Sequence, residues 1–401
     1  MRIRPAWVSV FVMVGLVTLG GAESVLAQAG GGQVVKLGEG ETLTISGFIN
    51  ATLYGNNGFF GFGNGQNAEF ANPAQPATDK NYVDGDVRNT RLNFTFSGPV
   101  VLGKWTPKAT LEADFFGAFN GAPPFGDEQP QMRVRFAFVD LTNGRTTLRI
   151  GQFWSPLFGE VPVSITHVAF PLGYGATGMI GWRFPGVFLY HELNPGKPTT
   201  MQIVLAALKN GGPDVGGGIP GGAASGAPQL EARLNVGHRK GTSNVTGYVV
   251  GHIDWKDTTA VGTAGNNLQG SGIEAGGNVT IDKFTVHGNV YTGKAMGQQF
   301  AHIAQQGNVK GWGAWVQGGY EFTPHWGAWV YYGLDRPDQA NSPGLPAVNP
   351  RLKNDDISGM LRFRAGRYQV GAEYFRSETT YGGATGKQHA NQLALSVMYT
   401  I

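Results

Sequence analysis

The end of the chain is the feature that most constrains its fold. Residues 389–401 read HANQLALSVMYTI, with apolar side chains on alternate positions from Leu393 to Ile401. Because successive side chains of a β-strand point to opposite faces, this period of two predicts a strand with one apolar and one polar face. Such a strand needs a partner at each edge, and we expect residues 43–54 to close a sheet against it.

The same alternation recurs along the whole chain and predicts an all-β fold, a closed antiparallel barrel of about 16 strands. An even number of strands is usual for barrels that span bacterial outer membranes, with short periplasmic turns and long outer loops. Short and long connections alternate here in that manner, although a count of 14 or 18 is an alternative. The expected strands are 43–54, 91–97, 108–116, 132–141, 147–153, 186–193, 201–208, 229–237, 245–256, 273–281, 284–292, 312–322, 326–335, 357–364, 368–377 and 392–401.

Composition supports this fold and excludes several classes of protein. The chain has 64 glycines, which disfavour helices, and beyond its first residues no stretch is apolar enough for a transmembrane helix. It has no cysteine, so it has no disulfide framework and no thiolate metal site. A net charge of +3 argues against nucleic acid as a partner.

The first residues have the pattern of a secretory signal peptide. Arg2 and Arg4 precede an apolar run at 8–19, and small residues offer a cleavage site before Gln28. We therefore expect three parts: a signal peptide at 1–27, a short periplasmic lead-in at 28–40, and a barrel domain at 41–401.

Charged side chains fall on the polar parity of several expected strands. A charged group that faces lipid costs roughly 2–4 kcal/mol at the middle of the bilayer, so this parity must face water inside the barrel. A basic wall would attract anions, since guanidinium groups suit carboxylates. The alternative is that the arginines only pair with nearby acids and line the lumen. Anion selectivity and pairing with acids are compatible with each other. The expected lumen-lining residues are Arg91, Glu112, Asp114, Arg133, Arg135, Arg149, Arg362 and Arg364.

The loop at residues 154–182 is long and apolar, so it needs burial. Folding into the lumen as a constriction would bury it, and packing on a neighbouring subunit is the alternative. Its ionisable residues include Glu160 and His167. In the strand before it, Gln152 falls on the lipid parity, and a bulge or an early strand end at Gly151 would correct this.

Three motifs, in this order and topology, resemble Gram-negative porins, and most of all the DcaP-like trimeric porins. They are ATLEADF at 109–115, RVRFAFVDL at 133–141 and LRIGQFWSPLF at 148–158. The resemblance implies a 16-stranded barrel, a trimer, an inward-folded third loop and uptake of small solutes, often dicarboxylates. By motif, it also implies that Glu112, Asp114, Arg133, Arg135 and Arg149 line the pore.

We therefore expect a passive outer-membrane diffusion channel, with no cofactor, no metal and no catalysed reaction. The chain has neither a Gly-x-Ser-x-Gly nor a His-Glu-x-x-His motif. The expected partners are small anionic or neutral solutes, outer-membrane lipid and two further copies of the chain. Outward Phe94, Phe96, Phe136 and Phe138 are expected to contribute to the trimer contact. A non-conducting structural or adhesive barrel is the alternative.

Overall fold

The computed structural model describes residues 32–61, 69–73, 81–117, 131–166, 170–212, 218–257 and 267–401. Its helices are single turns, and none of them could cross a membrane. They are η1 (Tyr174–Ala176), α1 (Gly221–Ala224), η3 (Gly297–Gln299) and α2 (Ala301–Ala304). The strands are β1 (Gln33–Gly38), β2 (Glu41–Asn57), β3 (Phe59–Gly61), β4 (Phe70–Asn72), β5 (Asn81–Asp86), β6 (Arg91–Ser97), β7 (Thr106–Asp114), β8 (Arg133–Asn143), β9 (Thr146–Trp154), β10 (Arg183–Glu192), β11 (Thr199–Leu208), β12 (Gln229–Lys240), β13 (Ser243–Asp257), β14 (Asn267–Ile281), β15 (Phe284–Lys294), β16 (Lys310–Glu321), β17 (Trp326–Pro337), β18 (Arg351–Ala365), β19 (Tyr368–Tyr381) and β20 (Lys387–Thr400).

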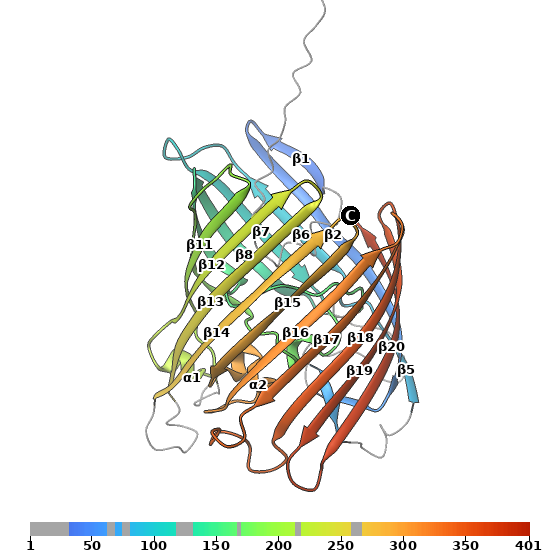
Figure 1. Cartoon of the computed structure of the whole chain (residues 1–401). Coiled ribbons are helices and arrows are strands. Elements are labelled where there is room, and N and C mark those ends of the chain that lie inside the picture. Colours follow the sequence, from blue (N-terminus) through green and yellow to red (C-terminus); the bar gives the residue numbers. More distant parts are fainter. Residues whose placement is uncertain are drawn as a thin grey trace, which may run out of the picture.

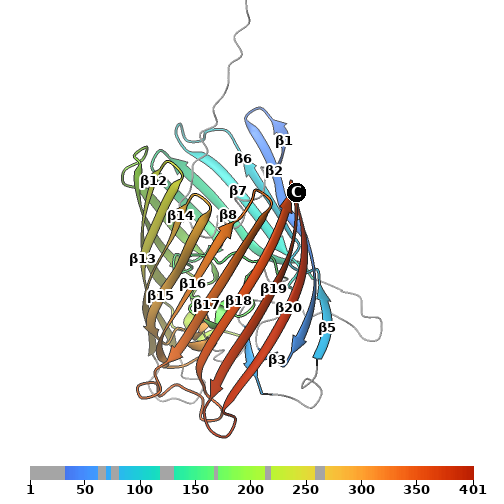
Figure 2. The same ribbon diagram turned by 45° about the vertical axis from the view of Figure 1, so that its right-hand side comes forward.

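The strands close into one antiparallel barrel of 16 positions, as the sequence predicted (Figure 1). The last strand, β20, pairs with β2 from Thr400 opposite Phe48 to Asn391 opposite Asn57. Figure 2 shows the two strands side by side at the closure of the ring. This pairing removes both sheet edges, which would otherwise be open to association.

The first loop is shorter than expected, because β5 and β6 form one interrupted strand of the wall. Both pair with β2, β6 along its first part and β5 along its second. The expected strands 43–54 and 91–97 therefore leave out part of the wall, since β2 extends to Asn57 and β5 occupies 81–86. β5 reads NYVDGD and lacks the apolar alternation by which the other strands were recognised.

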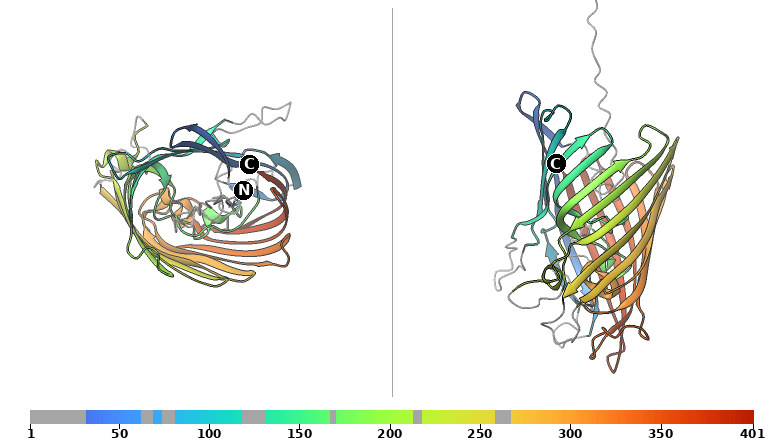
Figure 3. Two further views of the ribbon diagram at one scale, coloured as in Figure 1. Left: turned by 90° about the horizontal axis from the view of Figure 1, so that it is seen from above. Right: turned by 90° about the vertical axis from the view of Figure 1, so that its left-hand side faces the viewer.

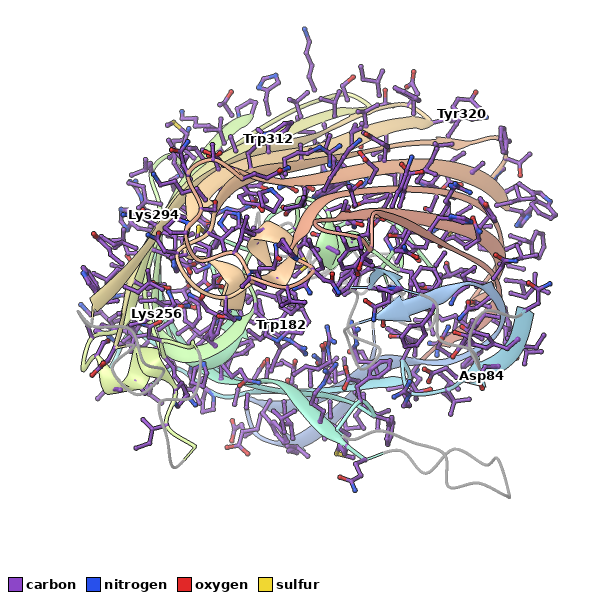
Figure 4. All side chains as sticks on the ribbon, turned by 90° about the horizontal axis from the view of Figure 1, so that it is seen from below. Asp84, Trp182, Lys256, Lys294, Trp312 and Tyr320 are labelled. Carbon is purple, nitrogen blue, oxygen red and sulfur yellow. The ribbon has the colours of Figure 1, made fainter. Side chains whose placement is uncertain are left out.

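The outer face of the barrel is apolar and the inner face is polar. Leu53, Val330 and Leu395 are all more than half exposed on the outside. On the opposite parity Asn50 and Gln317 are buried inside. Aromatic side chains stand on the outer face near strand ends, where a membrane interface favours them. Figure 4 places two of these, Trp312 and Tyr320, at the outer edge of the ring.

A bulge at Arg135 changes which side chains of β8 face the lumen. The residues on either side of Arg135 pair with β7, but Arg135 itself has no opposite residue. Val134 and Val139 are exposed on the outer face, whereas Phe136 and Phe138 are buried in a cluster with loop residues. The expectation that Phe136 and Phe138 point outward is wrong, because one extra residue reverses the parity of all that follow.

The irregularity expected near Gly151 of β9 lies in β8 instead. β9 runs to Trp154 and keeps a regular register with β10 throughout. The side-chain amide of Gln152 donates hydrogen bonds to the carbonyls of Val134 and Arg135, both at 3.0 Å. It thereby satisfies backbone groups at the bulge that have no partner in the β8–β9 ladder.

The predicted lead-in, residues 28–40, contains the strand β1 in its described part. β1 pairs with the first residues of β2, from Gln33 opposite Ile45 to Gly38 opposite Glu41. This is the edge of β2 that β20 occupies further along, and the amide of Ile401 donates to the carbonyl of Gly47 at 2.9 Å. All of β1 is exposed. The expected signal peptide, residues 1–27, lies outside the described residues.

Long connections leave the end of the barrel opposite the C-terminus, and three of them turn inward, after β2, β9 and β15. Figure 3 shows, along the barrel axis, that the green segment after β9 and the orange segment after β15 lie inside the ring. The lumen is therefore partly filled by the chain's own loops. The charged side chains of the wall and these loops form the candidate site.

Candidate functional site in the barrel lumen

Charged side chains of β6, β7 and β8 form a hydrogen-bonded ladder on the lumen wall. Arg133 donates from Nε and Nη2 to the two oxygens of Asp114, at 2.9 and 2.6 Å. Arg135 bridges both acids, donating to Glu112 at 2.7 Å and to Asp114 at 3.0 Å. Arg91 lies 3.7 Å from Glu112. Because Glu112 and Asp114 are buried, they depend on these arginines for compensation of their charge.

Arg183, the first residue of β10, joins this group, and the sequence prediction missed it. Its guanidinium lies 5.0 Å from the ring centroid of Trp154 and 4.4 Å from that of Trp182. Only 7% of the residue is exposed, and Nε and Nη1 have no hydrogen-bond partner among the described residues. The sequence gives no indication of this position, since by parity Arg183 falls with the outward Pro185 and Val187.

The four arginines act as one electrostatic unit, which we call the arginine cluster: Arg91, Arg133, Arg135 and Arg183. The electrostatic neighbours of Arg183 include the other three and Asp114. Four guanidinium groups therefore surround two carboxylates, and the cluster and its acids carry a net charge of +2. Arg88 stands beside the cluster, but it is paired with Asp86 and lies near Glu69.

Arg149 lies on the lumen wall as expected, but its charge is neutralised. Its Nε and Nη2 donate to the two oxygens of Asp140, at 2.8 and 2.9 Å. The guanidinium is also 3.8 Å from the ring centroid of Phe138. Without the bulge Asp140 would point to lipid, so the sequence could not identify this partner.

Arg362 and Arg364 of β18 lie apart from the arginine cluster. Arg362 donates to Glu321 at 2.7 Å, and Arg364 donates to the carbonyl of Pro324 at 3.1 Å. Both therefore bond to groups at or beside the short turn between β16 and β17. In the ring β18 is separated from β6 by β19, β20 and β2. The structure thus divides the predicted arginines into three sets: Arg91, Arg133 and Arg135 in the cluster, Arg149 beside Asp140, and Arg362 with Arg364 near this turn.

We call residues 155–182 the constriction loop, and its described part, 155–166 and 170–182, folds into the lumen. Gln317 of β16 holds the loop backbone most directly, accepting from the amide of Val163 at 2.7 Å and donating to its carbonyl at 2.8 Å. The described part lies inside its own barrel, in accord with the prediction and not with packing on a neighbouring subunit. Other wall side chains that bond to the loop backbone include Arg233 of β12, Asn289 of β15 and Asn354 of β18.

Glycine allows the constriction loop to approach the wall closely. A Cβ at Gly159 would lie 1.7 Å from the hydroxyl of Tyr248 and 2.3 Å from a carboxylate oxygen of Glu274. Both neighbours are wall residues, on β13 and β14. Any larger residue at this position would therefore push the loop away from the wall.

Glu160 lies against the wall far from the arginine cluster. Its carboxylate is 3.9 Å from Nδ1 of His287 on β15, about half-way round the ring from β7. Its carbonyl accepts from the hydroxyl of Tyr174 at 2.7 Å. Burial raises the pKa of the Tyr174 hydroxyl well above its usual range, so Tyr174 stays a neutral donor. The other predicted loop residue, His167, lies outside the described residues.

The constriction loop covers two carboxylates of the wall, Glu231 on β12 and Glu373 on β19. Glu231 accepts from the amide of Leu157 at 2.8 Å, and Glu373 accepts from the hydroxyl of Ser164 at 2.7 Å. Both carboxylates are buried. Among the described residues, the loop makes no hydrogen bond to the arginine cluster. The loop thus masks these two carboxylates, while the cluster keeps its positive charge.

Two further connections also turn inward, which the sequence did not predict. In the connection after β15, the carbonyl of Gln299 accepts from the amide of Gly181 at 3.0 Å. The ring of Phe300 lies 4.7 Å from that of Trp182, which Figure 4 places near the middle of the barrel. In the β3–β4 hairpin, the carbonyl of Ala71 accepts from the hydroxyl of Tyr381 at 2.9 Å. These contacts brace the lumen at its long-loop end.

Solved structures share this architecture. The outer membrane channel DcaP of Acinetobacter baumannii superimposes with a TM-score of 0.69 over 92% of this chain and 100% of its own, at 16% identity. The fold is that of the outer-membrane porins. An anion-selective porin from Comamonas acidovorans has a TM-score of 0.56 over 90% of this chain and 100% of its own, at 12% identity.

A third structure, the trimer form of the outer membrane protein OmpT from Vibrio cholerae, has a TM-score of 0.50 over 90% of this chain and 99% of its own, at 13% identity. No family model and no curated protein sequence matches the chain. The resemblance to Gram-negative porins expected from the sequence is therefore confirmed in the fold. Identities this low establish the shared fold alone.

Proposed function

We propose that this protein is a passive outer-membrane diffusion channel for small hydrophilic solutes, with a mild preference for anions such as dicarboxylates. The apolar outer face and the porin fold support a location in the outer membrane, with the long loops outside. Solutes diffuse past the constriction loop, and the protein supplies no chemical step. Glu112 and Asp114 are paired with arginines, and Glu231 and Glu373 bond to the constriction loop.

The net charge of the arginine cluster is the observation that carries the preference for anions. Four guanidinium groups face two carboxylates, and the constriction loop masks Glu231 and Glu373. Rings or patches of one charge in a narrow aqueous path select ions electrostatically. The free Nε and Nη1 of Arg183 can donate to the planar oxygens of a carboxylate. The lumen roles of Arg91, Arg133 and Arg135 belong to this proposal.

We also propose that the protein forms a homotrimer. The trimer form of OmpT has the same fold, and Phe94 and Phe96 remain on the outward parity of β6. Phe96 is 44% exposed. Phe136 and Phe138 no longer belong to this surface, since both face the lumen.

Planar-bilayer recording of the purified, folded protein tests the proposed channel. We expect stepwise currents and, in a KCl gradient, a reversal potential of the sign that indicates preferred chloride flux. Absence of stepwise currents would refute the channel and favour the alternative of a non-conducting structural or adhesive barrel. A reversal potential of the opposite sign would refute only the preference for anions.

A further inference from the structure

Two lysines face each other on the outside of the barrel at its long-loop end. Lys294 is the last residue of β15, Lys310 is the first of β16, and they are direct partners in the antiparallel register. Both share the outward parity of Val290 and Trp312, which are 49% and 46% exposed. Figure 4 shows Lys294 and Trp312 toward the outside of the ring. Like charges directly opposite on neighbouring strands repel each other, so this position favours an anion.

On β17 to β20, outward basic side chains at the same end of the barrel are paired with acids, whereas Lys294 and Lys310 are left uncompensated. Lys353 of β18 lies 3.0 Å from Asp355, and Lys387 of β20 lies 2.6 Å from Glu378. Arg336 and Arg376 are paired with the same two acids. Among the described residues, neither Lys294 nor Lys310 has a carboxylate within ion-pair distance.

One acid, Asp338, lines the same depression as the two lysines and has Lys310 among its electrostatic neighbours. Its carboxylate accepts from the amide of Ala340 at 3.1 Å and from the side chain of Asn341 at 2.9 Å. Asp338 therefore bonds within its own loop and does not bridge the lysines. The two ammonium groups remain available to an external anion.

The lysines stand at one end of an apolar trough in the outer face. Around them is a depression of about 560 Å³, lined also by Ile273, Thr292 and Trp312. A second depression, of about 620 Å³, lies across β10–β13 and is apolar. Its outward lining residues are Val187, Leu189, Leu205, Ala207, Leu230, Ala232, Gly251 and Ile253.

The strand register joins the two depressions. Leu230, Ile253, Ser271 and Lys294 are successive cross-strand partners from β12 to β15. Because the strands are tilted (Figure 1), this row runs obliquely from the long-loop end across the outer face. Small residues at Ala207, Ala232 and Gly251 deepen its floor. One end of the trough is thus cationic and the remainder is apolar.

We propose that the trough binds a phosphorylated glycolipid of the outer leaflet. A phosphate lies between Lys294 and Lys310, and an acyl chain lies along the apolar floor. Charge complementarity selects this occupant, because two uncompensated ammonium groups beside an apolar channel match an anionic headgroup attached to hydrocarbon. Trp312 stands at the level where interfacial aromatic side chains contact headgroups. The inference rests on the proposed function only in placing the long loops at the outer leaflet.

Native mass spectrometry of the full-length protein in detergent, titrated with diphosphorylated lipid A, tests the site. The variant K294Q/K310Q removes both positive charges of the pair. Because each charge attracts the lipid phosphate, we expect lipid A binding to weaken roughly thirtyfold. The matched control K353Q/K387Q removes two charges at the same end but leaves Asp355 and Glu378 paired with Arg336 and Arg376, so binding should be unchanged. Equal binding by K294Q/K310Q and wild type, or an equal loss in the control, would overturn the site.

Other lipids and a second copy of the chain are separate arms of the test. Phosphatase-treated lipid A should bind wild type as weakly as lipid A binds K294Q/K310Q. Equal binding of phosphatidylglycerol would overturn the assignment to a glycolipid. The chain has no cysteine, so an intermolecular disulfide through Thr292→Cys would show instead that another copy covers the trough.

Failure of the site and failure of the channel are distinguishable. Both lysines face away from the lumen, so K294Q/K310Q should conduct as wild type does. A wild-type protein without currents that still binds lipid A would refute the channel alone. Normal currents with no lipid binding would refute the lipid site alone.

Discussion

Replacing Arg183 with Gln should reduce the anion preference of the channel without destabilising the barrel. Arg183 has no ion-pair partner among the described residues, and two of its nitrogens are buried without hydrogen bonds. Its removal therefore leaves no carboxylate uncompensated. This distinguishes it from Arg133 and Arg135, whose loss would strand the buried Asp114.

The size of the effect follows from Coulomb's law. An ion that passes about 6 Å from the guanidinium interacts by about 0.7 kcal/mol at the dielectric constant of water. Screening over a Debye length of about 10 Å at 0.1 M salt reduces this to about 0.4 kcal/mol. Because the sign is opposite for cations, the ratio of anion to cation permeability should fall about fourfold, and further wherever the local dielectric constant is lower.

Reversal potentials in a KCl gradient across a planar bilayer measure this ratio. Arg183→Lys keeps the charge and should keep the selectivity. Arg364→Gln removes the same charge near the short turn, beside Glu321, and should have a smaller effect because it lies far from the cluster. An unchanged reversal potential in Arg183→Gln, or an equal change in Arg364→Gln, would refute the assignment of selectivity to the arginine cluster.

Three further predictions concern stability and the lumen. Arg135→Met leaves two buried carboxylates short of a partner, so urea unfolding of the folded barrel should show a loss of about 3–5 kcal/mol; an unchanged midpoint contradicts the role of the ladder. Gly159→Val should displace the constriction loop from Tyr248 and lower single-channel conductance. Gly359→Val is the control and should not lower it, because a Cβ at Gly359 would have no atom within 4 Å. Equal conductance of the two variants would refute the close approach of the loop to the wall. Deleting residues 33–38 should leave heat-dependent gel mobility and conductance intact, since β1 is exposed and lies outside the ring, and loss of folding would contradict this.

Strand number, closure and the inward third loop were predictable from the sequence because each follows from a local requirement. Lipid outside and polar groups inside impose a period of two on every strand that crosses the membrane. The closing strand at 392–401 and its partner at 43–54 both carry that period, and β20 pairs with β2 as expected. The constriction loop was recognisable because a long apolar connection has to be buried.

Odd or even position in a strand no longer predicts which face a side chain occupies where the backbone departs from a regular ladder. This limited the prediction of the site. The bulge at Arg135 reverses the faces of Phe136, Phe138 and Asp140, and no residue type in β8 marks it. Arg183 falls on the outward parity but lies inside, because the chain enters β10 from the constriction loop. β5 lacks apolar alternation, so its place in the wall was missed.

The sequence by itself therefore determined the barrel, and tertiary structure determined the charge that a solute meets. In each strand, apolar residues that face lipid alternate with polar residues that face water, so the strand can be recognised from its own sequence. Pairing among charges depends on which side chains from different strands reach the same point. Only the closed structure shows that Arg149 is neutralised by Asp140, that Glu231 and Glu373 are masked by the loop, and that Arg183 remains uncompensated.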